Sequence, residues 1–135
     1  MMDLNKLKKL YNKEHIDIVN WKMNKNKARI LQGGVVFIDY SQIDNEIEEK
    51  ELLAEELGHY YYDAYYNYNS SSSLIRKAEY KANKWKSLNL VTLQDLLLCK
   101  EKGINDIPHI AYELQVSPAS VEFSYNYYRS KNEIT

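Results

Sequence analysis

A short stretch near the middle of the chain carries three side chains that can hold and activate a water molecule. It reads Leu53-Ala54-Glu55-Glu56-Leu57-Gly58-His59-Tyr60. Residues four apart lie on the same face of a helix, so Glu55 and His59 project side by side and can grip one metal ion. Glu56 is rotated by about 100° from Glu55. It is therefore poorly placed as a ligand, but it can reach a water molecule on that ion.

This spacing is that of the His-Glu-x-x-His helix of metallopeptidases, with Glu55 in place of the first histidine. A catalytic zinc ion keeps three protein ligands and one open position, so a third ligand is required. Glu79 is the best candidate, because it lies on the next expected helix between the small residues Ala78 and Ala82. Small residues let two helices approach closely. We therefore expect Glu55, His59 and Glu79 as metal ligands and Glu56 as the general base.

Other residues near this helix have possible roles in the site. Asp63 lies four residues after His59 and either bonds the second imidazole nitrogen, as carboxylates behind metal sites do, or is a polar residue at a helix end. The tyrosines between Tyr60 and Tyr68 could donate hydrogen bonds to a developing oxyanion. We interpret most of them as packing residues and single out none. His15 and His109 have no partner at ligand spacing.

The elements that must position these residues follow from the hydrophobic pattern. Asp3 can cap a first helix that runs to about Asn12. Strands are expected over 15–21, 28–32 and 35–40, and Gly33-Gly34 between the last two is a hairpin signal. The motif helix should begin near residue 42 or 45 and run to about 62, and a second long helix should span 74–88. The serine-rich segment 67–73 between them is expected to be a loop.

Three shorter helices are expected after residue 90, over 93–102, 107–114 and 118–128. We expect one domain over 1–135, with the sheet and the metal-site helices in 1–89 and a helical, helix-turn-helix-like extension in 90–135. The expected fold class is α+β: a small three-stranded antiparallel sheet, a zincin-like two-helix metal site and a helical C-terminal part.

Composition excludes several classes of function. The chain has 135 residues, a net charge of −1 and a single cysteine, Cys99. It therefore has no global basic field for nucleic acid or anionic membranes, and it does not look built for an oxidising compartment. The first residues lack an apolar signal-peptide region, and no apolar run approaches the ~20 residues of a membrane helix. We expect a cytoplasmic protein without membrane contact, its oligomeric state being open.

Three features together resemble the ImmA/IrrE family of metallo-endopeptidases of bacteria and their mobile elements. They are a strand ending in Ile38-Asp39, the motif Glu55-Glu56-Leu57-Gly58-His59, and Glu79-x-x-Ala82-Asn83 on the following helix. The segment 107–121 is similar to the helix-turn-helix-like region of that family. The resemblance covers roughly residues 34 to 126. It departs from the family pattern at Glu55, where most members carry histidine.

The resemblance implies an enzyme that cleaves or inactivates a helix-turn-helix repressor of a phage or other mobile element. Carried over by position, Glu55, His59 and Glu79 would bind Zn²⁺ and Glu56 would activate water. Two glutamates and one neutral histidine formally neutralise a divalent ion, which makes it a weaker Lewis acid. An oxygen-rich site also suits Mn²⁺ or Fe²⁺ better than a histidine-rich one does.

Other interpretations stay open at this point. Glu55 and Glu56 could be solvated glutamates in the acidic run 46–56, and His59 a partly buried histidine bonded to a carboxylate. The protein could be a non-catalytic antagonist that binds the repressor with a structural metal or none. It could also be a DNA-binding regulator, but the expected last helix has no arginine or lysine before Arg129, and phosphate contacts need such cations.

Overall fold

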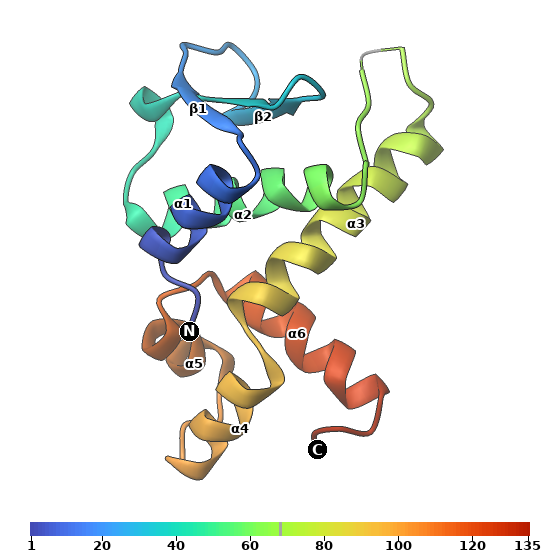
Figure 1. Ribbon diagram of the computed structural model, residues 1–135. Helices are drawn as coiled ribbons and strands as arrows, with labels where there is room; N and C mark the ends of the chain where they lie inside the picture. Colours follow the sequence, from blue (N-terminus) through green and yellow to red (C-terminus); the bar gives the residue numbers. More distant parts are fainter. Residues whose placement is uncertain (68) are drawn as a thin grey trace.

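The computed structural model describes residues 1–67 and 69–135. They form a small sheet lying over the motif helix, with the C-terminal helices gathered around the lower end of the long helix that follows it (Figure 1). In chain order the elements are α1 (Leu4–Lys13), β1 (Asp17–Asn20), β2 (Ala28–Leu31), β3 (Val35–Ile38), the 3-10 turn η1 (Tyr40–Gln42), α2 (Glu46–Tyr61), α3 (Ser72–Leu90), α4 (Leu93–Glu101), α5 (Ile107–Leu114) and α6 (Pro118–Ser130).

The fold class is α+β as predicted, but the prediction of a purely antiparallel meander is wrong. The strand order is β1-β3-β2. The hairpin at Gly33-Gly34 pairs β2 with β3 antiparallel, whereas β1 pairs with β3 in parallel. The reason lies in β3, whose four residues Val-Val-Phe-Ile are all apolar. Such an uninterrupted run suits the central strand of a sheet, while the shorter apolar patterns of β1 and β2 suit its edges.

The turn from β3 into α2 fixes where the motif helix begins. Asp39 is buried and accepts hydrogen bonds from the backbone of Met23 and Ser41 and from the side chains of Ser41 and Gln42. These bonds hold the pKa of Asp39 well below its usual range. Asn45 then caps α2 by accepting from the Glu48 N–H at 2.9 Å. Helix α2 therefore begins at one of the two predicted positions.

Helices α2 and α3 cross with almost no space between them at Gly58. A Cβ atom on Gly58 would lie 2.5 Å from the carbonyl oxygen and 2.7 Å from the Cα of Ala82. Ala78 and Ala82 are both buried at this crossing. The expectation that small residues on α3 allow close helix packing is thus confirmed, and Gly58 is the matching small residue on α2. This crossing brings Glu79 next to His59.

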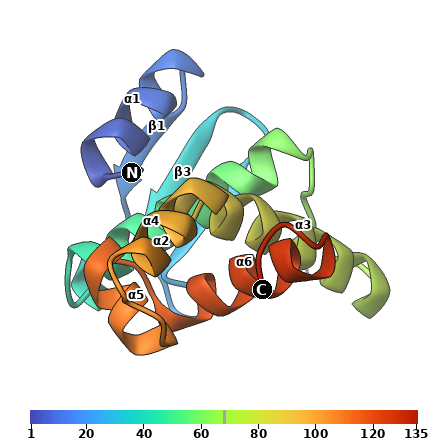
Figure 2. The ribbon, with the colours of Figure 1, turned by 90° about the horizontal axis from the view of Figure 1, so that it is seen from below.

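The C-terminal helices are tied to α2 by a buried carboxylate. Glu51 accepts hydrogen bonds from the hydroxyl groups of Ser117, at 2.6 Å, and Ser120, at 2.7 Å. Ser117 is also the N-cap of α6. Helix α3 packs against both α2 and α6, and its C-terminal half runs beside α6 (Figures 1 and 2).

The boundaries of the other elements follow the predictions closely. Asp3 is the N-cap of α1 as expected, and Thr92, Asp106 and Ser117 are the N-caps of α4, α5 and α6. Helix α3 is longer than predicted and begins at Ser72, because Ser71 caps it. The predicted loop 67–73 is therefore shorter, and Tyr68 within it lies outside the described residues. Cys99 is buried, and no helix of the described chain is long and apolar enough to cross a membrane.

Candidate metal centre

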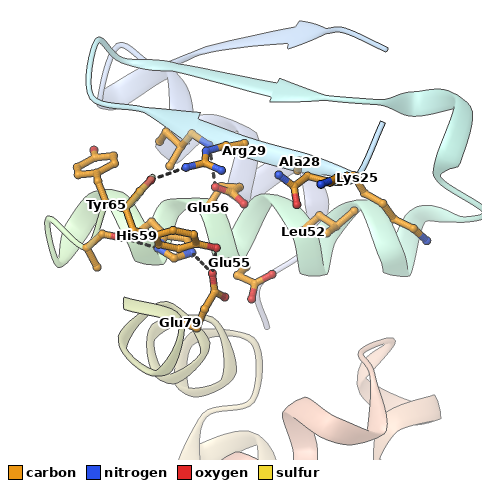
Figure 3. A pocket seen from close by; sticks show the side chains of 14 residues that line it. Lys25, Ala28, Arg29, Leu52, Glu55, Glu56, His59, Tyr65 and Glu79 are labelled. Carbon is orange, nitrogen blue, oxygen red and sulfur yellow. Dashed lines mark hydrogen bonds and ion pairs between the residues drawn. The ribbon is translucent and has the colours of Figure 1, made fainter. Parts of the chain in front are cut away.

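The four principal residues predicted from the motif all line one pocket of about 260 Å³ between the sheet edge, α2 and α3. Glu55, Glu56 and His59 enter it from α2 and Glu79 enters it from α3 (Figure 3). The upper wall comes from β2 and the residues before it, and one side comes from the segment after α2. Three carboxyl groups and one imidazole thus face the same small volume.

His59 is held in one orientation by the backbone just beyond its own helix. It is buried, and its Nδ1 lies 2.7 Å from the carbonyl oxygen of Ala64. A carbonyl oxygen can only accept, so Nδ1 carries the proton and Nε2 faces the pocket. This is how a backbone carbonyl fixes the tautomer of a metal-binding histidine. The bond forms because α2 ends at Tyr61 and the chain turns back toward the imidazole.

Glu79 is the partner of the other nitrogen of His59, Nε2. Its Oε1 lies 3.5 Å from His59 Nε2 and accepts a hydrogen bond of 2.5 Å from the Tyr66 hydroxyl. The hydrogen bonds from His59 and Tyr66 lower the pKa of Glu79 despite its partial burial. Burial alone would lower the pKa of His59, but Glu79, Glu56 and the Ala64 carbonyl outweigh it and raise that pKa.

Glu55 and Glu56 differ in exposure, as their positions on α2 require. Glu55 is half-buried at the rim of the pocket, and burial, with a contribution from Glu79, raises its pKa. Glu56 is 7% exposed and accepts a hydrogen bond of 2.8 Å from the Ile30 N–H of β2. Burial raises the pKa of Glu56 to about 7, the range in which a carboxylate is an effective general base near neutral pH.

In the pocket, His59 and Glu79 form an ion pair, and the carboxyl groups of Glu55 and Glu56 lie close by. Among residues 1–67 and 69–135, no group of three or more His, Cys, Asp or Glu side chains is positioned to hold a metal ion. The reason is visible in the contacts of Glu79, whose Oε1 turns to His59 Nε2 and the Tyr66 hydroxyl. The predicted ligands share a pocket, but two of them are bonded to each other.

Of the two roles left open for Asp63, the bond to His59 is not formed, and Asp63 is a polar residue just beyond the end of α2. That bond would have required α2 to continue as a helix to residue 63, whereas the helix ends at Tyr61 and Asp63 has a left-handed φ of 50°. The second nitrogen of His59 bonds the Ala64 carbonyl instead. His15 and His109 lie outside the pocket lining, and His109 pairs with Asp106 at 2.7 Å.

Two residues that the motif did not reveal complete the pocket. Arg29 of β2 donates a hydrogen bond to the carbonyl of Tyr66, and its guanidinium carbon lies 5.2 Å from the centre of the Tyr66 ring. The Tyr66 hydroxyl donates a hydrogen bond to Glu79. Burial, together with this hydrogen bond, raises the pKa of Tyr66 to about 12. The predicted tyrosine cluster contained Tyr66, but spacing along the chain gave no reason to prefer it. Tyr68, in the same cluster, lies outside the described residues.

The chain matches no protein-family model, and no curated protein or solved structure is detectably similar to it. The resemblance to the ImmA/IrrE family therefore depends on the sequence motifs alone.

Proposed function

We propose that this protein is a metal-dependent endopeptidase, with zinc as the first metal to test, that acts on a helix-turn-helix repressor of a phage or mobile element. The observation that carries the proposal is the convergence of Glu55, Glu56, His59 and Glu79 on one pocket from two helices. The repressor as substrate, and the bacterial mobile-element setting, come from the motif resemblance.

The residues of the pocket fit a divalent cation by their chemistry. His59 presents Nε2 with Nδ1 already committed to a carbonyl, which is the tautomer that a metal ion requires. Glu55 and Glu79 supply two further oxygen donors at the same pocket. If His59 and Glu79 each bound one cation in place of their ion pair, the positive charge would also reduce the repulsion among the three carboxylates. A bound cation would polarise a peptide carbonyl and make water more acidic.

Glu56 is the residue that moves protons in this proposal. Its carboxylate is fixed by the Ile30 N–H, so it faces the pocket without rotating freely. Without a cation, burial raises the pKa of Glu56 to about 7, and beside a cation the carboxylate would be ionised and able to accept a proton from water and return it to the leaving amine. The edge position of β2 places this carboxylate beside a strand against which an extended peptide can lie.

Tyr66 is the best placed donor for the oxyanion that forms as water attacks a peptide carbonyl. Its hydroxyl already lies in the pocket, bonded to Glu79, and its raised pKa keeps it protonated as a hydrogen-bond donor. Arg29 holds the Tyr66 backbone and ring. Once Glu79 turns to a cation, the hydroxyl group is free to donate to substrate.

The direct test is co-expression with the candidate repressor, comparing wild type with Glu56→Gln. We expect the repressor to be cleaved by wild type and to stay intact with the variant, because glutamine keeps the Ile30 hydrogen bond but cannot accept a proton. Metal content should be equal in the two proteins. An intact repressor with metal-loaded wild type would contradict the proposal.

A second candidate function is a non-catalytic antagonist that binds the repressor. The His59–Glu79 ion pair favours it, because this contact satisfies both side chains without a metal ion. Two carboxylate ligands would also weaken any bound cation as a Lewis acid. In the same co-expression, derepression that persists in Glu56→Gln with the repressor intact would identify an antagonist.

A further inference from the structure

The outward face of α3 is basic and carries an exposed aromatic ring. Arg76, Lys77, Tyr80 and Lys81 line a shallow hollow on this helix together with Ser73, and all five side chains are exposed. Tyr80 has 57% of its surface in solvent. Glu79, the neighbouring acid, points away into the pocket (Figure 3).

Helix α6 extends this face beyond α3. The rings of Tyr80 and Phe123 lie 5.9 Å apart between centroids. One turn further along α6, the Tyr127 ring has Lys84 Nζ at 5.3 Å and Lys131 Nζ at 5.3 Å from its centroid. These contacts join the two helices into one surface. We call it the basic-aromatic face, and it comprises Arg76, Lys77, Tyr80, Lys81, Lys84, Phe123, Tyr127 and Lys131.

The cations of the basic-aromatic face are not neutralised by the protein. Within the described part of the chain, none of its five Lys and Arg side chains forms an ion pair. Glu122 is exposed on α6, but it points about 100° away from Phe123 around the helix. The acidic residues that bring the whole chain to −1 include the run at the start of α2. A nearly neutral chain therefore has a local positive surface.

We propose that the basic-aromatic face binds single-stranded nucleic acid. Lysine and arginine side chains neutralise phosphates and release counterions, which drives binding without regard to sequence. The exposed Tyr80 ring beside them offers a platform on which an unpaired base can stack. A duplex keeps its bases stacked inside, so Tyr80 would gain nothing from it. Residues 118–128 of α6 contain no lysine or arginine, and the cations of this face come mainly from α3.

Fluorescence anisotropy with a labelled oligothymidine of about 20 nucleotides tests this binding. We expect a Kd of about 10⁻⁴ to 10⁻⁶ M at physiological salt, and a log–log salt slope near −3.5, about 0.7 for each cation. The duplex form of the same length should bind more weakly. Tyr80→Ala should reduce affinity for the single strand about tenfold, and Lys77→Gln with Lys81→Gln should reduce both the affinity and the slope.

The matched control is Lys9→Gln with Lys22→Gln, which removes the same charge from exposed positions on α1 and after β1. It should leave affinity unchanged, and thermal unfolding should show that all variants are folded. The proposal is overturned if wild type does not bind, or if the control loses as much affinity as the α3 variant. It is also overturned if Tyr80→Ala binds like wild type, or if polyglutamate binds as well as the oligonucleotide, which would indicate an acidic protein partner.

Discussion

At the scale of single residues, the pocket is organised by what each polar group is bonded to. His59 is fixed through Nδ1 by a carbonyl, Glu56 is fixed by a backbone N–H, and Glu79 is shared between His59 and Tyr66. Nε2 of His59 and the pocket carboxylates are the groups that would bind a ligand, once the contact between Nε2 and Glu79 is given up. That Glu55, Glu56 and His59 share one pocket could be predicted from the Glu-Glu-x-Gly-His spacing, while their roles stay predictions. The position of Tyr66 in the pocket could not be predicted. It depends on how the segment after α2 folds back, and no spacing in the sequence indicates that.

Tyr66→Phe tests the oxyanion role at this scale. The substitution removes one hydroxyl that contacts Glu79 and should lower kcat by about 10²-fold, as the loss of one oxyanion donor does. Metal content and KM should change little, because phenylalanine keeps the ring beneath Arg29. Tyr65→Phe is the matched control in the same loop. Equal kcat values for Tyr66→Phe and wild type would exclude the role.

The raised pKa of Glu56 predicts a pH dependence of stability in metal-free protein. Folding raises this pKa from 4.5 to about 7. The stabilising contribution of the protonated group is complete below about pH 4.5 and is lost as the pH rises through about 7. At 1.36 kcal/mol per pKa unit, the change is roughly 3 kcal/mol.

Urea unfolding in EDTA at about pH 5 and about pH 8 measures this loss. Glu56→Gln should flatten the dependence, leaving the smaller change of the same sign that comes from the raised pKa of His59. If the variant and wild type lost the same free energy of unfolding between the two pH values, Glu56 would not be the titrating group.

At the scale of elements, the site depends on how closely α2 and α3 pack. The sequence indicated small residues on α3, and Ala78 and Ala82 are indeed buried at the crossing. It did not indicate that Gly58 is the contact point on α2, because a glycine within a motif is equally compatible with a ligand-approach role. The strand order β1-β3-β2 could not be predicted from the sequence either. Alternating patterns identify strands but not their neighbours, and the continuous apolar run of β3 was the one signal of a central strand.

Gly58→Ala tests the helix crossing. The added Cβ would lie 2.5 Å from the Ala82 carbonyl oxygen, so the helices must separate. Overpacking of this kind costs about 1–3 kcal/mol, and it should also move Glu79 away from His59 and weaken metal binding. Gly33→Ala is the matched control, since its added Cβ meets nothing within 4 Å. A Gly58→Ala protein as stable and as metal-loaded as the control would contradict this packing.

At the scale of the whole molecule, buried polar contacts join parts that are far apart in sequence. Glu51 on α2 binds the Ser117 and Ser120 hydroxyls of α6, 66 and 69 residues further along the chain. The sequence predicts a helix from residue 118 but not the contact of Ser117 with Glu51, because Glu51 belongs to the acidic run 46–56. The basic-aromatic face was hidden in the same way, because its residues come from two helices whose contact the sequence does not encode.

Glu51→Ala should therefore destabilise the molecule, although its position in an acidic run suggests an exposed residue. It leaves the buried Ser120 hydroxyl and the half-buried Ser117 hydroxyl without their shared acceptor, which costs about 1–3 kcal/mol. Glu122→Ala, at an exposed position of α6, should stay within about 0.5 kcal/mol of wild type. Chemical denaturation of both variants gives the comparison. Equal stabilities would mean that the Glu51 contact does not hold α6 to α2.

The metal content of protein purified without chelator tests the central claim most directly. Wild type should carry about one equivalent of zinc, manganese or iron, and Glu79→Gln should lose most of it, because Glu79 is the ligand that the second helix supplies. Mass spectrometry of the metal ions in both proteins measures this. A wild-type protein that takes up no stoichiometric metal even with zinc supplied, or a Glu79→Gln variant as loaded as wild type, would contradict a metal centre at this pocket.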